Sequence, residues 1–302
     1  MTTQLVVRGV ITPLLTPLTN GDQWVNKRAL AEHVNWLIEQ GVHGLMPCGT
    51  TGEGPLLTAI ERRRVLEVVV KAAAQRVPVL AHVGTAMTRE TIALARHARD
   101  CGADAVSVVT PYFFRLPDGA QIEHFCRVAD AVPDMPVYLY NIPQNTGNYL
   151  TRAIVEAILA HCPNVAGIKD SSGNLATLTS FIGLRSGRFQ VVCGSDALLL
   201  QALQAGAIAS VSGNSNVFPE ILVGLFQAFW KGDSEHARRL QEQLDVARLA
   251  MGDGGSLATL KRVAEVRVRQ ARQMGGVRGP LPGAYAAELH DGLAKLRAAG
   301  LL

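Results

Sequence analysis

Two residues of types that support covalent chemistry, Tyr140 and Lys169, each close a short apolar run. Tyr140 ends the run Val-Tyr-Leu-Tyr at 137–140, and Lys169 ends Val-Ala-Gly-Ile-Lys at 165–169. A lysine held among core side chains loses hydration, which disfavours its charged form and leaves a nucleophilic amine. A neighbouring phenol can transfer protons to and from such a centre. The pair therefore predicts chemistry through an imine formed on the lysine.

Each residue alone also has an ordinary structural interpretation. Lys169 could be a strand-end lysine paired with the adjacent Asp170, because lysines are rarely buried without a partner. Tyr140 could be a core aromatic residue whose hydroxyl is hydrogen-bonded. The chemical interpretation requires both side chains to reach one site, so it depends on the elements that carry them.

Short β-branched or apolar runs recur along the chain, with amphipathic stretches between them. The runs predict eight strands, at 9–16, 44–48, 77–83, 105–109, 137–141, 166–169, 190–193 and 208–212. The stretches between them predict helices at 27–39, 58–74, 89–100, 121–131, 152–160, 175–184, 197–205 and 220–229. Thr151 and Asp196 are predicted N-caps of two of these helices.

Eight strand-helix units favour an α/β fold of the (β/α)8 TIM-barrel class over an open, doubly wound sheet, which has fewer units and a glycine-rich first turn. The 302 residues suffice for a barrel of about 250 residues with an appendage. After residue 231 the strand signal ends, and three helices are predicted at 234–250, 256–273 and 285–299. We therefore expect a barrel with the active site at 1–231 and a C-terminal three-helix extension at 232–302.

Composition and motif content argue against several other classes of function. The net charge of +4 is spread along the chain and aromatic content is only 5%, which does not favour nucleic-acid binding. Five cysteines without CxxC spacing predict neither a disulfide framework nor a zinc site, and they favour the reducing cytoplasm. The eight histidines form no close ligand pair, so no metal is expected. No apolar run approaches a membrane span of about 20 residues, so no membrane association is expected.

The C-terminal ends of barrel strands form the rim where active sites lie, and three predicted features reach it. Tyr140 ends the fifth strand, Lys169 ends the sixth, and Gly-Thr-Thr-Gly-Glu at 49–53 follows the second. The backbone N–H groups of that turn and the hydroxyls of Thr50 and Thr51 could hold a carboxylate. A strand-to-helix turn with a threonine cap explains the same residues equally well. Convergence on one rim favours the catalytic interpretation.

Glycine-containing segments also follow the last two predicted strands, where many barrels bind phosphate. These are Gly-Ser-Asp at 194–196 and Ser-Gly-Asn at 212–214. Gly194 and Asp196 could contact hydroxyl groups of a polar substrate, or the segment could simply turn the chain.

Five motifs in order along the chain resemble those of the dihydrodipicolinate synthase / N-acetylneuraminate lyase family. They are Thr-Pro at 16–17, Gly-Thr-Thr-Gly-Glu at 49–53, Tyr-Asn-Ile-Pro at 140–143, Gly-Ile-Lys-Asp-Ser-Ser at 167–172 and Gly-Ser-Asp at 194–196. Each motif is weak alone, but five in order are specific. The tail beyond them is similar to the family's helical extension.

The resemblance implies a Schiff-base, class I lyase or aldolase without a metal or organic cofactor. It implies that Lys169 forms the imine with the 2-oxo carbon of pyruvate or a longer 2-oxo acid, while Tyr140 relays protons. Thr50 and Thr51 would bind the carboxylate, with Thr51 counted among the catalytic residues, and the backbone at Ala209 would lie near the pyruvate unit. Family members are usually tetramers built as dimers of dimers, so a homotetramer is implied too.

Two positions depart from the synthases of this family. Their segment Tyr-Asn-(Val/Ile)-Pro-Ser-Arg-Thr-Gly has an arginine that binds a carboxylate of the aldehyde substrate, whereas Asn145 stands there in this chain. An amide lacks the charge and the bidentate fork that a carboxylate prefers. The tyrosine that the synthases lend across a dimer interface aligns with Phe113, which has no hydroxyl, although a shift of one residue would place Tyr112 there.

The function indicated is a Schiff-base-forming lyase acting on pyruvate or a 2-oxo acid. The Asn-Thr-Gly ending at 145–147 resembles that of 4-hydroxy-2-oxoglutarate aldolases, and 2-keto-3-deoxy sugar acid aldolases and dehydratases also lack the arginine, so the resemblance favours an enzyme of one of these types. The first alternative is a 4-hydroxy-tetrahydrodipicolinate (dihydrodipicolinate) synthase that condenses pyruvate with aspartate semialdehyde. The second is a non-catalytic barrel that binds a 2-oxo acid, an alternative supported by the missing hydroxyl at Phe113. The physiological acceptor, the stereochemistry and any allosteric effector are left open.

Overall fold

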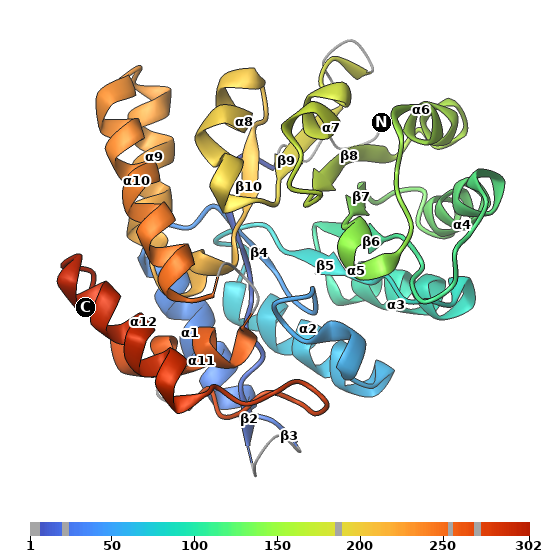
Figure 1. Ribbon diagram of the computed structural model, residues 1–302. Helices are drawn as coiled ribbons and strands as arrows, with labels where there is room; N and C mark the ends of the chain where they lie inside the picture. The colour runs from blue at the N-terminus through green and yellow to red at the C-terminus, as the bar shows by residue number, and fades with distance from the viewer. Residues whose placement is uncertain (1–6, 20–23, 185–188, 253–255, 269–272) are drawn as a thin grey trace. The chain divides into compact units, whose positions relative to one another are not determined.

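A computed structural model of the chain describes residues 7–19, 24–184, 189–252, 256–268 and 273–302. The chain divides into two compact units. The first contains Pro78–Val211 with the N-terminal residues up to Arg8, and the second contains Gly9–Val77 and Ser212–Leu302. Strands and helices alternate along the first unit, and each of the eight predicted strands is present in the chain (Figure 1).

The first unit is built on parallel strands that neighbour one another in sequence order. They are β5 (Leu80–His82), β6 (Ala105–Val109), β7 (Val137–Asn141), β8 (Val165–Asp170), β9 (Gln190–Cys193) and β10 (Ala209–Val211). Almost all of their residues are buried. Parallel strands that are covered on both faces read as nearly continuous apolar runs. For this reason β6, β7 and β9 begin and end at the predicted residues.

Helices follow these strands close to the predicted positions. They are α3 (Thr88–Cys101), α4 (Asp118–Ala131), α6 (Arg152–His161), α7 (Leu175–Ser180) and α8 (Leu199–Ala205). α6 has its predicted cap, because the Thr151 hydroxyl accepts a hydrogen bond from the Ile154 N–H at 3.3 Å. The N-cap prediction for Asp196 is wrong. Asp196 lies inside a 3₁₀ turn, η4 (Asp196–Leu198), which separates β9 from α8, and Leu198 takes the cap position.

The second unit contains the parallel pair β1 (Gly9–Pro13) and β4 (Gly44–Met46), with helices α1 (Lys27–Glu39), α2 (Ala59–Ala73) and α9 (Pro219–Trp230). α2 begins with a capping box in which the side chains of Thr58 and Glu61 each bond the other residue's backbone N–H. An antiparallel hairpin of β2 (Leu18–Thr19) and β3 (Trp24–Val25) was not predicted. Two-residue strands are too short to show alternation in the sequence.

Three further helices follow α9 in the second unit. They are α10 (Ser234–Ala250), α11 (Leu257–Arg267) and α12 (Ala286–Ala298). α10 packs against both α9 and α12 (Figure 1). The helix predicted at 256–273 is too long, because α11 ends at Arg267 and Val268 is extended; residues 269–272 lie outside the described part. The expected domain boundary at residue 231 stays a prediction.

The core of the second unit contains a fully buried histidine. His33 on α1 lies with Nε2 3.1 Å from Asn216 Oδ1. The Asn216 amide nitrogen donates to the carbonyl oxygens of Pro13 and Gly213, so its Oδ1 is the acceptor and His33 Nε2 carries the proton of the neutral imidazole. Burial lowers the pKa of His33 to about 4.

Acidification is expected to weaken folding through this histidine. The unfolded chain protonates His33 at an ordinary pKa of 6.5, whereas the folded chain does so only near 4. Its contribution is therefore present above pH 6.5 and is lost as the pH falls toward 4, at up to about 1.4 kcal/mol per pH unit. Urea denaturation at pH values between 4 and 6.5 measures the slope of the free energy of unfolding against pH. His33→Gln, which keeps a donor for Asn216, should flatten it, and an unchanged slope would contradict the assignment.

Candidate active site

The strand register places Tyr140 and Lys169 side by side. Tyr140 of β7 pairs with Lys169 of β8, Lys169 pairs with Val192 of β9, and Val192 pairs with Ala209 of β10. Because side chains alternate along each strand, residues in register on parallel strands point to the same face of a sheet. Tyr140, Lys169 and Ala209 therefore share one row and one face in the first unit, as the predicted site requires.

The amino group of Lys169 lies against the aromatic ring of Tyr140. Nζ is 3.8 Å from the ring centroid, and the two residues are only 7% and 2% exposed. Within the described residues, the Lys169 amino group has no hydrogen-bond or ion-pair partner. The structural alternative, in which Lys169 pairs with Asp170, is wrong because neighbouring side chains of a strand point to opposite faces. The structure thus presents a buried amine beside a phenol ring, here called the candidate pair.

Asp170 belongs instead to a hydrogen-bond group on the other face of β8. Its Oδ1 accepts a hydrogen bond from Asn141 Nδ2 and its Oδ2 accepts one from Ser172 Oγ, each at 2.7 Å. Burial raises the pKa of the Asp170 carboxyl, and these hydrogen bonds oppose that shift. The group ties the C-terminal ends of β7 and β8 together, immediately after the candidate pair.

The second tyrosine of β7 is the ordinary core residue. Tyr138 donates its hydroxyl to Gln190 Oε1 at 2.7 Å, and burial raises the pKa of the phenol. Gly167 makes room for the ring, because a Cβ there would lie 2.8 Å from Tyr138 Cε1 and 2.4 Å from the Gln190 carbonyl oxygen. His82 of β5 is buried and packs edge-on against Tyr140, with ring centroids 5.8 Å apart. Close aromatic packing therefore restricts the ring of Tyr140.

A close backbone approach shapes the segment after β9. The Gly194 N–H donates to the Asp170 carbonyl oxygen at 2.8 Å, and a Cβ at Gly194 would lie 1.9 Å from Ser171 Oγ. A side chain at this position would therefore require Ser171 to move. Asp196 is partly exposed on η4. Substrate contact by Gly194 and Asp196 stays a prediction.

Asn148 holds the loop that carries Tyr112 and Phe113. Its Nδ2 donates to the carbonyl oxygens of Pro111 at 2.7 Å and Phe114 at 2.8 Å. Phe113 is 87% exposed and has a φ of 82°, a left-handed conformation that persists in a non-glycine residue only where its surroundings impose it. Its ring packs edge-on against that of Phe114, whereas Tyr112 is partly buried. Sequence reasoning did not identify Asn148 as the residue that fixes this loop.

Asn145 lies on the short helix α5 (Pro143–Thr146), directly after β7, and is exposed. The neighbouring Gln144 donates its Nε2 to the Ser171 carbonyl oxygen at 2.7 Å, which attaches α5 to the end of β8. The chain therefore presents a neutral amide at this position, on an element held to the strand that carries the lysine.

The predicted carboxylate-binding turn lies in the second unit. The N–H groups of residues 52–54 donate to the carbonyl oxygens of Gly49 and Thr50. The expectation that the backbone N–H groups of the turn are available to a ligand is therefore wrong for these residues, because the turn bonds within itself. Thr50 is exposed, and Thr51 keeps both its N–H and its hydroxyl without a partner among the described residues. Thr51 thus offers the open donors of the turn.

The C-terminal segment holds Glu53, the last residue of this turn. Its Oε1 forms an ion pair with Lys261 Nζ at 2.5 Å, and both side chains are 0% exposed. Its Oε2 accepts a hydrogen bond from the Arg278 N–H at 2.6 Å, and Lys261 Nζ also donates to the Gly276 carbonyl oxygen at 2.7 Å. Burial lowers the pKa of Lys261, and Glu53 opposes that shift. Glu53 itself has a φ of 57°, so these contacts hold a left-handed backbone.

Sequence reasoning included Glu53 in its motif but missed its partners. Lys261 and Arg278 lie far from the turn in sequence, among other charged residues of the C-terminal helices and loops. No local pattern separates a buried lysine of α11 from the exposed arginines near it. The contacts of Glu53 with Lys261 and Arg278 could therefore not be predicted from the sequence.

No group of three or more His, Cys, Asp or Glu side chains in the described residues could hold a metal ion. In the same part of the chain, no helix has the length and apolar character needed to cross a membrane. All five cysteines are free thiols.

The family of the chain follows from comparison with known proteins. A family model described as the dihydrodipicolinate synthetase family matches residues 6–277. The chain belongs to this family. An uncharacterized DapA-like lyase of Halobacterium salinarum is 40% identical over 92% of this chain and 90% of its own length. A 4-hydroxy-tetrahydrodipicolinate synthase of Methanopyrus kandleri is 38% identical over 79% of each chain. The resemblance and the prediction of an enzyme, a lyase of this family, are confirmed.

Solved structures agree with this assignment. The dihydrodipicolinate synthase of Aquifex aeolicus matches with a TM-score of 0.91 and 29% identity, over 98% of this chain and 99% of that one. A prophage protein of the dihydrodipicolinic acid synthase family from E. coli K12, solved in complex with pyruvate, matches with a TM-score of 0.90 and 31% identity over 98% and 99% of the two chains. The predicted fold class, a (β/α)8 TIM barrel with C-terminal helices, is confirmed.

Proposed function

We propose that this member of the dihydrodipicolinate synthetase family is a Schiff-base lyase that acts on pyruvate or a longer 2-oxo acid. One observation carries the proposal: Lys169 Nζ is buried, lies 3.8 Å from the centroid of the Tyr140 ring and has no hydrogen-bond or ion-pair partner among the described residues. A nucleophilic lysine needs such desolvation and freedom from an anionic partner. The pyruvate complex of the related prophage protein supports the choice of ligand.

The chemistry proposed for the candidate pair proceeds in balanced steps. The neutral amine of Lys169 adds to the 2-oxo carbon, and loss of the oxygen as water leaves the imine. Loss of a proton from the adjacent carbon gives an enamine, which forms a carbon–carbon bond to an aldehyde; the reverse sequence cleaves that bond. Tyr140 is the proposed proton carrier for these steps. Thr50 and Thr51 are proposed to bind the carboxylate, and the Ala209 backbone to lie near the pyruvate carbons.

Asn145 points to a 2-keto-3-deoxy sugar acid or 4-hydroxy-2-oxoglutarate type aldolase or dehydratase. The exposed amide on α5 can bond hydroxyl groups, but it provides no charge for a second carboxylate. The competing candidate is a synthase that condenses pyruvate with aspartate semialdehyde. The names of relatives such as that of Methanopyrus kandleri favour this alternative.

Borohydride reduction tests the mechanism. Protein incubated with pyruvate and then reduced should gain the mass of one reduced pyruvate adduct, and peptide mapping should place it on Lys169. The absence of an adduct, or an adduct on a different lysine, would refute the proposal. An adduct without turnover of any aldehyde or hydroxy-oxo acid would instead indicate a barrel that only binds 2-oxo acids.

An acceptor assay separates the two enzymatic candidates. With pyruvate and aspartate semialdehyde, the wild-type protein is expected to form little cyclic product, because Asn145 offers no cation to the acceptor carboxylate. Asn145→Arg should raise that activity about 10- to 100-fold. A hydrogen bond to a charged group contributes about 1.5–3 kcal/mol, which corresponds to a change of that size. Chromatography measures the cyclic product formed by the wild-type protein and by Asn145→Arg. Efficient synthesis by the wild-type protein would make the synthase the correct assignment.

Two further features are proposed, the first from the resemblance and the second from the cysteines. The first is a homotetramer, supported by the exposed aromatic pair of Phe113 and Phe114, whose ring centroids are 5.0 Å apart. Light scattering of the purified protein measures the oligomeric state. The second is a cytoplasmic location, supported by the five free cysteines.

A further inference from the structure

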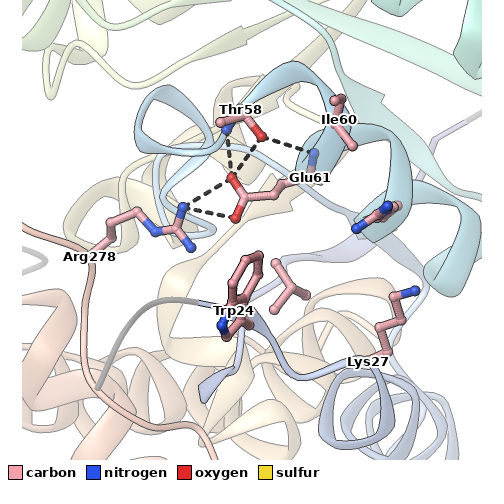
Figure 2. A pocket seen from close by; sticks show the side chains of 8 residues that line it. Trp24, Lys27, Thr58, Ile60, Glu61 and Arg278 are labelled. Atoms are coloured by element: carbon pink, nitrogen blue, oxygen red, sulfur yellow. Dashed lines mark hydrogen bonds and ion pairs between the residues drawn. The ribbon is translucent and has the colours of Figure 1, made fainter. Parts of the chain in front are cut away.

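A pocket of about 550 Å³ lies in the second unit, beside the start of α2 and the hairpin strand β3. None of its lining residues belongs to the proposed Schiff-base site. Figure 2 shows Trp24 and Lys27 on one side and Ile60 and Glu61 of α2 on the other, with Arg278 reaching toward Glu61. The volume lies within the range of sites that bind small molecules.

The apolar part of this pocket is open to solvent. Trp24 is 61% exposed and Ile60 is 63% exposed, and Val25 also lines the pocket. Exposed large apolar side chains that gather at one concave surface indicate a binding site. An indole face beside branched aliphatic groups suits an aromatic or branched apolar body.

The charged part of the pocket has an excess of cations. Lys27, Arg64 and Arg278 line it together with one carboxylate, that of Glu61. Glu61 is already engaged by Arg278 Nη1, at 2.9 and 3.0 Å, and by the N–H and hydroxyl of Thr58. Lys27 and Arg64 are exposed and have no ion-pair or hydrogen-bond partner within the described residues. The pocket therefore offers two unpaired cations to an anionic group.

We propose that this pocket binds a small organic carboxylate with an aromatic or branched apolar body. The carboxylate would lie between Lys27 and Arg64, and the apolar body would pack on Trp24 and Ile60. Arginine recognises a carboxylate through two parallel hydrogen bonds, so Arg64 is the principal anchor.

Arg278 connects this pocket to the turn that contains Thr51. Its guanidinium lines the pocket and pairs with Glu61, while its backbone N–H holds Glu53 at 2.6 Å. A carboxylate held by Lys27 and Arg64 lies beside the ion pair of Glu61 and Arg278 and draws the Arg278 guanidinium away from Glu61, which shifts the Arg278 backbone N–H that holds Glu53. The ligand is therefore an inhibitor that raises the KM for pyruvate; this second step rests on the proposed function, whereas binding itself does not.

Calorimetry with 3-phenylpropionate tests the binding site. The wild-type protein should bind the probe saturably, and the uncharged 3-phenylpropanamide should bind at least about tenfold more weakly, a difference of about 1.4 kcal/mol. Arg64→Gln and Trp24→Ala should each weaken binding by a similar factor. Arg63→Gln is the matched control, because Arg63 is an exposed neighbour on α2 that does not line the pocket. Equal binding by Arg64→Gln and the wild-type protein would overturn the proposal.

Two further measurements distinguish this site from the site of Lys169. Protein whose Lys169 has been trapped with pyruvate, and the Lys169→Arg variant, should bind 3-phenylpropionate as tightly as the wild type. In turnover assays the probe should raise the KM for pyruvate by about fivefold, the lower end of usual coupling between sites, and Arg64→Gln should abolish that effect. Loss of probe binding in trapped protein would show that the probe binds at the Lys169 site and would refute a second site. An unaltered KM at saturating probe would refute the connection through Arg278.

Discussion

Replacement of Lys169 by arginine is expected to abolish the borohydride-trapped pyruvate adduct and to lower kcat at least about 1,000-fold. The guanidinium stays protonated at all accessible pH values, so it has no lone pair to add to a 2-oxo carbon. It can still lie flat over the Tyr140 ring, where Nζ lies now, so the variant removes the nucleophile with little change in packing. Intact mass after reduction and steady-state kinetics measure the two effects.

A matched control shows whether the effect is specific to this position. Lys231, at the C-cap of α9, is exposed, and Lys231→Arg should leave both the adduct and kcat unchanged. Circular dichroism and thermal melting show that each variant is folded. A pyruvate adduct that persists in Lys169→Arg would assign the imine to another lysine and would contradict the proposed role of the candidate pair.

The strands and helices were predictable where burial makes the sequence pattern strong. β6, β7 and β9 are fully buried, and their apolar runs end where the strands end. The bounds of α1 were predicted because its apolar residues follow helical spacing. Weak local patterns account for the errors: the two-residue strands β2 and β3 show no alternation, and the turn η4 moved the start of α8 beyond Asp196.

The candidate pair was predictable because the ends of neighbouring strands adjoin, so topology alone brings Tyr140 and Lys169 together. The contacts that organise the residues around the candidate pair were not predictable. Asn148 and Lys261 act on backbone and side-chain groups that are remote in sequence, and a polar residue in an amphipathic stretch gives no sign of its partner. Hydrogen bonds inside the turn at 49–54 likewise depend on backbone geometry, which composition does not reveal.

Lys261→Met is expected to destabilise the protein by about 3–5 kcal/mol and to raise the KM for pyruvate more than it lowers kcat. The substitution leaves the Glu53 carboxylate buried without its cation, and Oε1 then has no partner of opposite charge. Glu53 follows Thr51 by two residues in the same hydrogen-bonded turn, so displacement of Glu53 moves the open donors of Thr51. Urea denaturation measures the first effect, and pyruvate saturation curves measure the second.

Two variants keep this prediction testable if Lys261→Met does not fold. Glu53→Gln is milder, because burial already lowers the pKa of Lys261 and an unpaired lysine can release its proton; it should raise the KM with a smaller loss of stability. The double variant Glu53→Gln with Lys261→Met removes both charges and should recover much of the stability lost in Lys261→Met.

Lys295→Met provides the comparison with an exposed pair. Lys295 of α12 pairs with Asp291 at 2.6 Å, but both side chains are more than half exposed, so its loss should change stability by at most about 1 kcal/mol. A loss of stability in Lys261→Met no larger than this would contradict the expected contribution of the buried pair. An unchanged KM in a variant that is clearly destabilised would show that the Glu53–Lys261 pair stabilises the fold without affecting pyruvate binding. A raised KM at nearly constant kcat would instead show that the C-terminal helices position the turn that contains Thr51.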